Sequence, residues 1–129
     1  MPTRHIICVL LCAAAMPAVS EERLSADDRV FLGKAEIEKT LIGRAIVSSN
    51  LATGMVSRWQ FHADGRVDFV NQSGPGRASG TWFLDADGLM CVTMALRTGC
   101  RYWFRKDGAI ANANTREPNA PTVAEIRFE

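Results

Sequence analysis

Three Asp-Gly pairs constrain the fold of this chain more than any other feature of its sequence. They are Asp64-Gly65, Asp87-Gly88 and Asp107-Gly108, and an aromatic residue stands five positions before each aspartate. Asp-Gly between two alternating segments is the strongest local signal for a tight hairpin, because glycine readily adopts the positive φ that such turns require. Three copies therefore predict three hairpins within one antiparallel sheet.

The segments around these pairs alternate apolar and polar residues with a period of two, which is typical of half-buried strands. Such segments occupy residues 44–49, 55–62, 66–70, 78–84, 89–96, 100–106, 109–113 and 122–128. Their spacing predicts a mainly β fold, an antiparallel meander of seven to eight strands that is either barrel-like or a curved sheet.

One short helix is expected to precede the strands. Residues 35–41 contain good helix formers, with Ile37 and Leu41 four positions apart on one face, and Gly43 follows as a stop signal.

The first twenty residues have the pattern of a secretory signal peptide. Arg4 supplies a positive start, an apolar run of eleven residues follows at 6–16, and small residues stand at positions 18 and 20. Eleven residues are too few to span a bilayer, which takes about twenty. A lipoprotein signal fits less well, because Cys12 lies inside the apolar run instead of after it. We expect cleavage after Ser20 and a periplasmic or secreted protein that does not span the membrane.

This pattern predicts three parts of the chain: a signal peptide at 1–20, a flexible N-terminal arm at 21–34 and one β-rich domain at 35–129. After cleavage the chain contains 14 basic and 14 acidic residues. A neutral chain without a basic run is not typical of proteins that bind nucleic acid or an anionic membrane surface. We therefore expect no nucleic-acid partner.

Two cysteines, Cys91 and Cys100, remain after cleavage and predict one disulfide bond in an oxidising compartment. Closing a ring of about ten residues should contribute about 2.5–3 kcal/mol to stability. A zinc site needs three or four ligands, and residues 21–129 offer only these two thiols and His62. Asp85 and Asp87 do not match a calcium loop, because the glycine comes too early and the final acid is missing. We expect no metal and no cofactor.

Residues suited to catalysis are sparse. His62 is the only histidine after residue 20, and nothing near it has the pattern of a nucleophile elbow. We expect no catalytic residues and a protein that is not an enzyme.

Aromatic residues supply the candidate contacts with a ligand or partner: Trp59, Trp82 and Trp103. Most aromatics in a small β domain are expected in the core. Two pairs of neighbours, Trp82-Phe83 and Trp103-Phe104, must place one ring on each face of a strand. The outward ring of each pair is the better candidate for contact at the surface.

Four motifs taken together resemble a group of small secreted bacterial proteins, common in alphaproteobacteria, whose function is not assigned. They are "LIGRAIV", "WQFHADGRVDF", "GTWFLDADGLMCV" and "CRYWFRKDGAI", and the resemblance covers residues 35–110. It implies a periplasmic β-rich domain with a disulfide and no catalytic residues. The chain departs from the group after Gly43, where Arg44-Ala45 replaces an expected polar pair.

Three functions are compatible with these features. The first is a non-enzymatic binding module that acts on an unknown envelope or secreted protein. The second is an inhibitor of a secreted hydrolase, since small periplasmic inhibitors of metalloproteases and of lysozyme resemble this chain in size, disulfide and Gly-x-Trp segments. The third is a lipocalin-like carrier of a small apolar ligand. A closed barrel with an apolar cavity favours the carrier, whereas a filled core with a protruding N-terminal arm favours the inhibitor.

Overall fold

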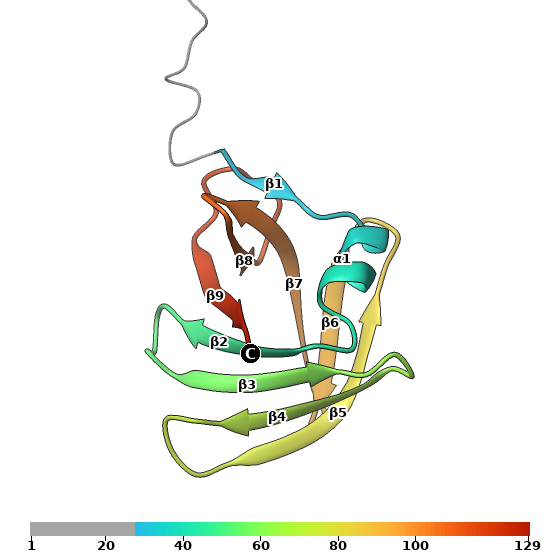
Figure 1. The fold of residues 1–129 in the computed structure, drawn as a ribbon, viewed down its shortest axis with the longest axis vertical. Coiled ribbons are helices and arrows are strands. Elements are labelled where there is room, and N and C mark those ends of the chain that lie inside the picture. Colours follow the sequence, from blue (N-terminus) through green and yellow to red (C-terminus); the bar gives the residue numbers. More distant parts are fainter. Residues whose placement is uncertain (1–27) are drawn as a thin grey trace, which may run out of the picture.

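Nine strands and one helix make up residues 28–129, the part of the chain that this computed structural model describes (Figure 1). The elements are β1 (Val30–Phe31), α1 (Lys34–Thr40), β2 (Ala45–Asn50), β3 (Val56–Phe61), β4 (Arg66–Asn71), β5 (Arg77–Leu84), β6 (Leu89–Met94), β7 (Arg97–Lys106), β8 (Ala109–Ala113) and β9 (Thr122–Phe128). The predicted signal peptide, with its cleavage after Ser20, and residues 21–27 of the predicted arm lie outside the described residues.

Eight of the strands close into an up-and-down barrel. Each strand from β2 to β8 pairs antiparallel with the strand that follows it, and β9 pairs back with β2. The predicted fold class, a mainly β antiparallel fold with one short helix and one disulfide, is confirmed. Of the two forms that the sequence left open, the strand pairing shows the barrel.

The two ends of the barrel differ. All three Asp-Gly hairpins lie at one end, where they join β3 to β4, β5 to β6 and β7 to β8. Helix α1 covers this end, which we call the helix end: Ile37 and Leu41 are fully buried in the core cluster, and Gly43 donates a backbone hydrogen bond to Phe61 at 2.7 Å. The opposite end, which we call the open end, has the loops 51–55, 72–76, 95–96 and 114–121.

The turns at the helix end have the backbone that the Asp-Gly pairs predict. Gly65 and Gly88 have φ of 92° and 88°, and in the third turn both Asp107 and Gly108 have positive φ. Gly88 has a second constraint, because a Cβ at this position would lie 2.5 Å from the carbonyl oxygen of Leu32. Glycine here therefore permits both the turn and its contact with the segment before α1.

The N-terminal arm ends earlier than the sequence predicts. Val30 and Phe31 of β1 pair with β7, and Leu32 is 2% exposed and donates a hydrogen bond to the Trp103 carbonyl oxygen at 2.9 Å. At Phe104, β8 pairs with one edge of β7. Strand β1 therefore pairs with the opposite edge, the one that pairs with β6 further along β7. The described end of the arm is thus part of the fold, since Phe31 and Leu32 pack against the barrel.

One two-residue turn has no glycine. Strands β6 and β7 are joined by Ala95 and Leu96, whose φ angles are 48° and 66°, and the Leu96 side chain is fully exposed. The sequence predicts a strand through Leu96, because no Gly, Asn or Asp marks the turn. Non-glycine residues in this conformation cost about 1–2 kcal/mol each, so other contacts must hold the two strands together.

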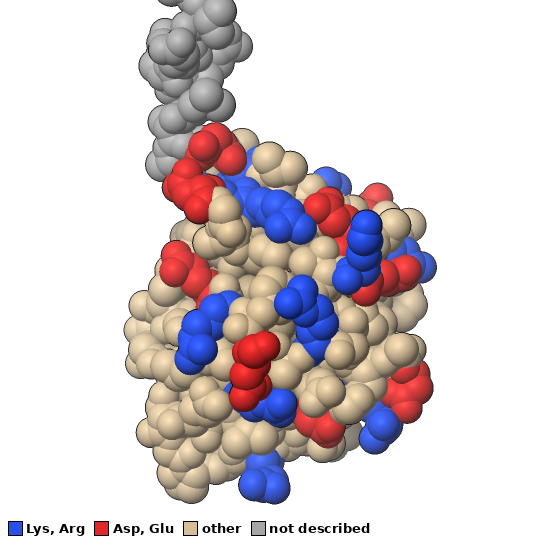
Figure 2. Space-filling model, viewed as in Figure 1, with Lys and Arg blue, Asp and Glu red and all other residues tan. Residues whose placement is uncertain are grey.

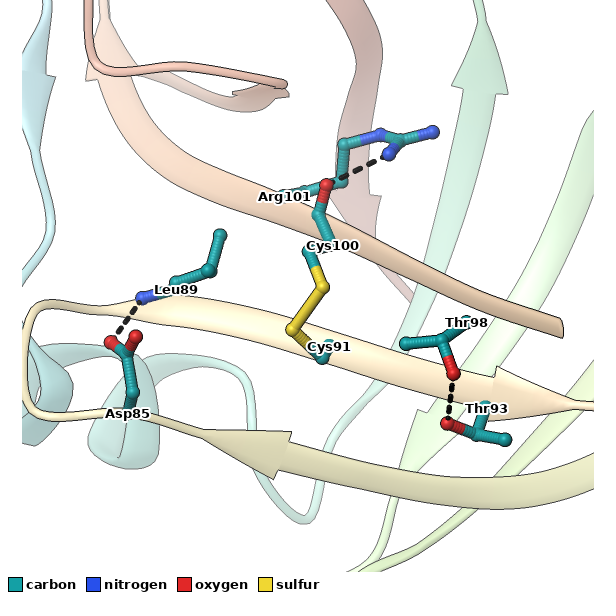
Figure 3. The surroundings of a disulfide bond; sticks show 7 residues. All are labelled: Asp85, Leu89, Cys91, Thr93, Thr98, Cys100 and Arg101. Carbon is teal, nitrogen blue, oxygen red and sulfur yellow. Dashed lines mark hydrogen bonds between the residues drawn. A yellow bond between two sulfur atoms is a disulfide. The ribbon is translucent and has the colours of Figure 1, made fainter.

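The predicted disulfide is one of these contacts (Figure 3). Cys91 on β6 and Cys100 on β7 stand opposite each other in the strand register and form the bond. Nearer the turn, the hydroxyls of Thr93 and Thr98 form a hydrogen bond of 2.8 Å across the same two strands. The predicted pairing of Cys91 with Cys100 is confirmed.

Candidate functional site

The interior of the barrel is filled at the helix end and hollow toward the open end. A cavity of about 660 Å³, which we call the chamber, is lined by residues near the open end such as Asn50, Met55 and Arg97. Residues next to α1, such as Val67 and Leu84, are instead buried in the packed core. An eight-stranded barrel is just wide enough either to be filled by its own side chains or to hold one small ligand, and this barrel does both at its two ends.

Small side chains create the hollow. Ala78 on β5 and Ala124 on β9 line the chamber from strands on opposite sides of the barrel, and Ser48, Ser57 and Gly99 line it between them. At the helix end the inward positions carry larger residues, and Ile37 of α1 adds to them. The chamber volume lies within the range of about 300–1,000 Å³ that is typical of small-molecule sites.

Most of the chamber wall is apolar. Aromatic and long apolar side chains line it from β3, β4 and β6: Trp59, Phe61, Phe69, Met90, Val92 and Met94. Trp59 packs edge-on against Phe69 of the neighbouring strand, with ring centroids 4.9 Å apart, and lies parallel to Phe61 at 6.1 Å. These three rings form a continuous apolar wall that could contact an apolar ligand.

Two of the three candidate tryptophans line the chamber. Trp59 and Trp103 are lining residues, whereas Trp82 packs against the core cluster and donates its Nε1–H to the His62 carbonyl oxygen at 2.7 Å. Trp59 donates its Nε1–H to the Ser57 hydroxyl at 2.9 Å. The Nε1 atom of Trp103 is buried without any hydrogen-bond partner. The structure therefore brings Trp59 and Trp103 together around one space and separates Trp82 from it.

The adjacent aromatic pairs behave differently from each other. Phe83 points outward and is 67% exposed, as the outward member of the first pair. Phe104 also points out of the barrel, but it is buried by a second apolar cluster that includes Phe31, Ala111 and Ala120. Phe83 is thus the outward ring that remains available at the surface.

The polar groups in the chamber wall are mainly hydrogen-bond donors. Arg97 and Arg101 of β7 and Asn112 of β8 line the chamber, and among the residues the structure describes no aspartate, glutamate or lysine does. The Oδ1 atom of Asn112 accepts the backbone N–H of Ala124 at 3.2 Å, so the NH₂ group, a donor, is the free end of this amide. Trp103 stands opposite Asn112 in the register of β7 and β8.

The sequence did not place either arginine of the chamber among the candidate contacts. A signal was present, because Arg97, Gly99, Arg101 and Trp103 alternate with a period of two, and so share one face of a strand. Figure 3 shows the consequence: Arg101 extends away from the disulfide, whose Cys100 belongs to the other face of β7. The guanidinium donates from Nη1 to the Cys100 carbonyl oxygen at 2.8 Å.

On the outer surface, basic and acidic side chains alternate. Figure 2 shows Lys and Arg interspersed with Asp and Glu over one face, without a large area of one sign. Three arginines form ion pairs there: Arg58 with Glu129, Arg66 with Asp64 at 2.8 Å, and Arg105 with Glu36 at 3.2 Å. Within residues 28–129, Arg97 and Arg101 have no such carboxylate partner.

His62 belongs to a polar cluster on the outside of the barrel. Its Nε2 atom lies 2.7 Å from Asp68 Oδ2, and the hydroxyl of Ser79 donates to Asp68 Oδ1 at 2.7 Å. These hydrogen bonds, first from His62 and then from Ser79, hold the pKa of Asp68 below its usual value. A histidine activates a serine only when the two are bonded. In this cluster the aspartate lies between them, so the arrangement does not activate Ser79 as a nucleophile.

At the second Asp-Gly turn, the Asp85 side chain accepts hydrogen bonds from the backbone of the turn. Asp85 Oδ1 accepts the N–H groups of Asp87 and Leu89, both at 2.9 Å, an arrangement that stabilises the turn. Across residues 28–129, no three His, Cys, Asp or Glu side chains gather in a way that could hold a metal ion. In the same residues, no helix is long and apolar enough to cross a lipid bilayer.

Comparison of the chain with models of protein families, with curated proteins and with solved structures found no match in any of the three. The resemblance to small secreted alphaproteobacterial proteins stays a prediction.

Proposed function

We propose that this protein is a non-enzymatic binding protein that carries one small, largely apolar ligand in the chamber of its barrel. The observation that supports this most is the cavity of about 660 Å³ with its aromatic wall. It lies next to a fully packed core in the same barrel. A ligand that fills it would gain about 25 cal/mol for each Å² of apolar surface removed from water. It would also restore the dispersion contacts that a hollow interior lacks.

The carrier is favoured over the hydrolase inhibitor and over a module that binds only through its outer face. The hollow apolar interior favours a carrier, since an inhibitor was expected to have a filled core, and the described end of the arm, Phe31 and Leu32, packs against the barrel. The loops at the open end carry the exposed apolar residues Leu51 and Leu96, which would flank the path of an apolar ligand. The outer charges are mixed in sign, and several form ion pairs with one another, so they favour no particular macromolecule.

We place the protein in the periplasm or outside the cell, after cleavage behind Ser20. The disulfide between Cys91 and Cys100 supports this location, because such bonds form and persist in oxidising compartments. A carrier in that space would keep a poorly soluble compound in solution between its source and its destination.

The test is binding of N-phenyl-1-naphthylamine, a neutral apolar dye whose fluorescence rises in apolar surroundings. The protein obtained by expressing the full chain should bind it saturably. Ala78→Trp should weaken binding about tenfold or more, because an indole at this lining position occupies space that the dye needs. Thr81→Trp places the same ring at an exposed position of the same strand, and it should leave the affinity unchanged.

Circular dichroism and thermal melting establish that both variants are folded. If Ala78→Trp does not fold, Val92→Trp, which fills the chamber from β6, replaces it. Absence of saturable dye binding to the wild type, or equal effects of the inward and outward substitutions, would contradict the carrier function.

A further inference from the structure

We infer that the ligand is an amphipath with an anionic head, and that Arg101 binds this head. The inference rests on the proposed function, since it names the chemical class of the compound that the chamber holds. It starts from the polarity of the chamber wall, which is uneven. Trp59, Phe61 and Phe69 form an apolar side on β3 and β4, while Arg101 and Asn112 place donors on the neighbouring strands β7 and β8.

Arg101 indicates the charge of the head group. Its guanidinium is half-buried in the chamber wall, and within residues 28–129 it forms no ion pair. A guanidinium presents parallel donors that match the two oxygens of a carboxylate or the oxygens of a phosphate.

A cationic or purely hydrocarbon ligand fits this wall less well. A cationic head would meet Arg101, and at the open end Arg97, with no acidic side chain among the described lining residues to offset the repulsion. A pure hydrocarbon would remove Arg101 and the Asn112 amide from water without offering either of them an acceptor. Exposed Arg97 at the start of β7 would in addition attract an anion toward the open end.

The test compares ligands that share one tail and differ in the head. Dodecanoate, dodecyl phosphate and 1-dodecanol are titrated in competition with the dye, the two anions below the concentrations at which they form micelles and the alcohol below its solubility limit. For the wild type, dodecanoate and dodecyl phosphate should bind on the order of tenfold or more tightly than dodecanol, as expected for hydrogen bonds to a charged group. The ratio between the two anions shows whether the head is a carboxylate or a phosphate.

Substitution of Arg101 should remove this preference selectively. Arg101→Gln should reduce the preference for dodecanoate to about threefold or less, while the affinity for dodecanol stays within about twofold. Arg58→Gln removes an equal charge from the outer pair with Glu129 and should change neither affinity.

The outcomes separate this inference from the proposed function. Binding of the dye and of dodecanol without a preference for either anion would overturn the inference and leave the carrier intact. Equal loss of dodecanol and dodecanoate in Arg101→Gln would overturn it as well, because that residue would then support the shape of the chamber. Failure of every ligand, dye included, would overturn the carrier function itself. The series of head groups on the wild type needs no substitution and decides the matter even if a variant misfolds.

Discussion

Replacing Gly80 with alanine is expected to lower the free energy of unfolding by about 3 kcal/mol. Gly80 lies on the inner face of β5, where the backbone of the paired strand β6 approaches it closely. A Cβ there would lie 2.0 Å from the carbonyl oxygen of Thr93 and 2.8 Å from Cγ of Met94. A side chain can rotate away from such an overlap, but a backbone oxygen cannot. The pairing of β5 with β6 would therefore have to shift, and Met94 at the wall of the chamber would shift with it.

The matched control is Gly99→Ala. Gly99 lies on β7 and also lines the chamber, but the nearest atom to its added Cβ is Nη1 of Arg101, at 4.0 Å. This substitution should be neutral or stabilise the protein by about 0.4–1 kcal/mol, because alanine restricts the unfolded chain. Thermal unfolding measures both, and Gly80→Ala should melt more than about 10 °C below the wild type. Equal melting temperatures for the two variants would contradict the close approach of the β6 backbone to Gly80.

Removal of the disulfide has the second largest expected effect. Cys91→Ala combined with Cys100→Ala should cost about 2.5–3 kcal/mol, the loop-closure contribution of a ring of ten residues. We expect the hairpin of β6 and β7 to depend most on the bond, because its turn residues Ala95 and Leu96 adopt an unfavourable conformation. Ala95→Asn with Leu96→Gly supplies the residues that this turn prefers. Adding these two changes to the cysteine-free protein should recover about 1–2 kcal/mol.

Denaturant unfolding of the exported protein measures this effect. Its intact mass, before and after reduction, serves as the control for the bond and also shows whether cleavage occurs after Ser20. A cysteine-free protein as stable as the wild type, or a rescue pair without effect, would show that the hairpin does not depend on the bond.

Local signals predict most of the strands. The three Asp-Gly turns act through the backbone freedom of single residues, so Gly65 and Gly88 could be placed from the sequence. The turn at Ala95 and Leu96 could not, because its strain is offset by the Cys91–Cys100 bond and the register of β6 with β7. Strand β1 was missed for a similar reason. Only two residues long, it is defined by its pairing with β7 and not by its own periodicity.

The chamber was harder to predict than the strands around it. Closure depends on the pairing of β2 with β9, which joins segments almost eighty residues apart, and no local pattern specifies it. The aromatic residues were expected in the core, and Phe61 is indeed buried in it. Whether such rings fill a barrel or line a hollow depends on the small residues that face them, such as Ala78 and Ala124. Their positions across the barrel become apparent only once the strands have closed.

The most direct test of the central claim, that the barrel holds an apolar ligand beside Trp59 and Trp103, is quenching of tryptophan fluorescence by 12-bromo-1-dodecanol. Bromine quenches an indole only at close range, so a chain bound in the chamber should quench saturably, with 1-dodecanol as the silent control. The quenching should be largely lost when Trp59→Phe and Trp103→Phe leave only Trp82, which lies outside the chamber lining. Quenching that rises linearly without saturation, and equally with Trp82 alone, would contradict the account.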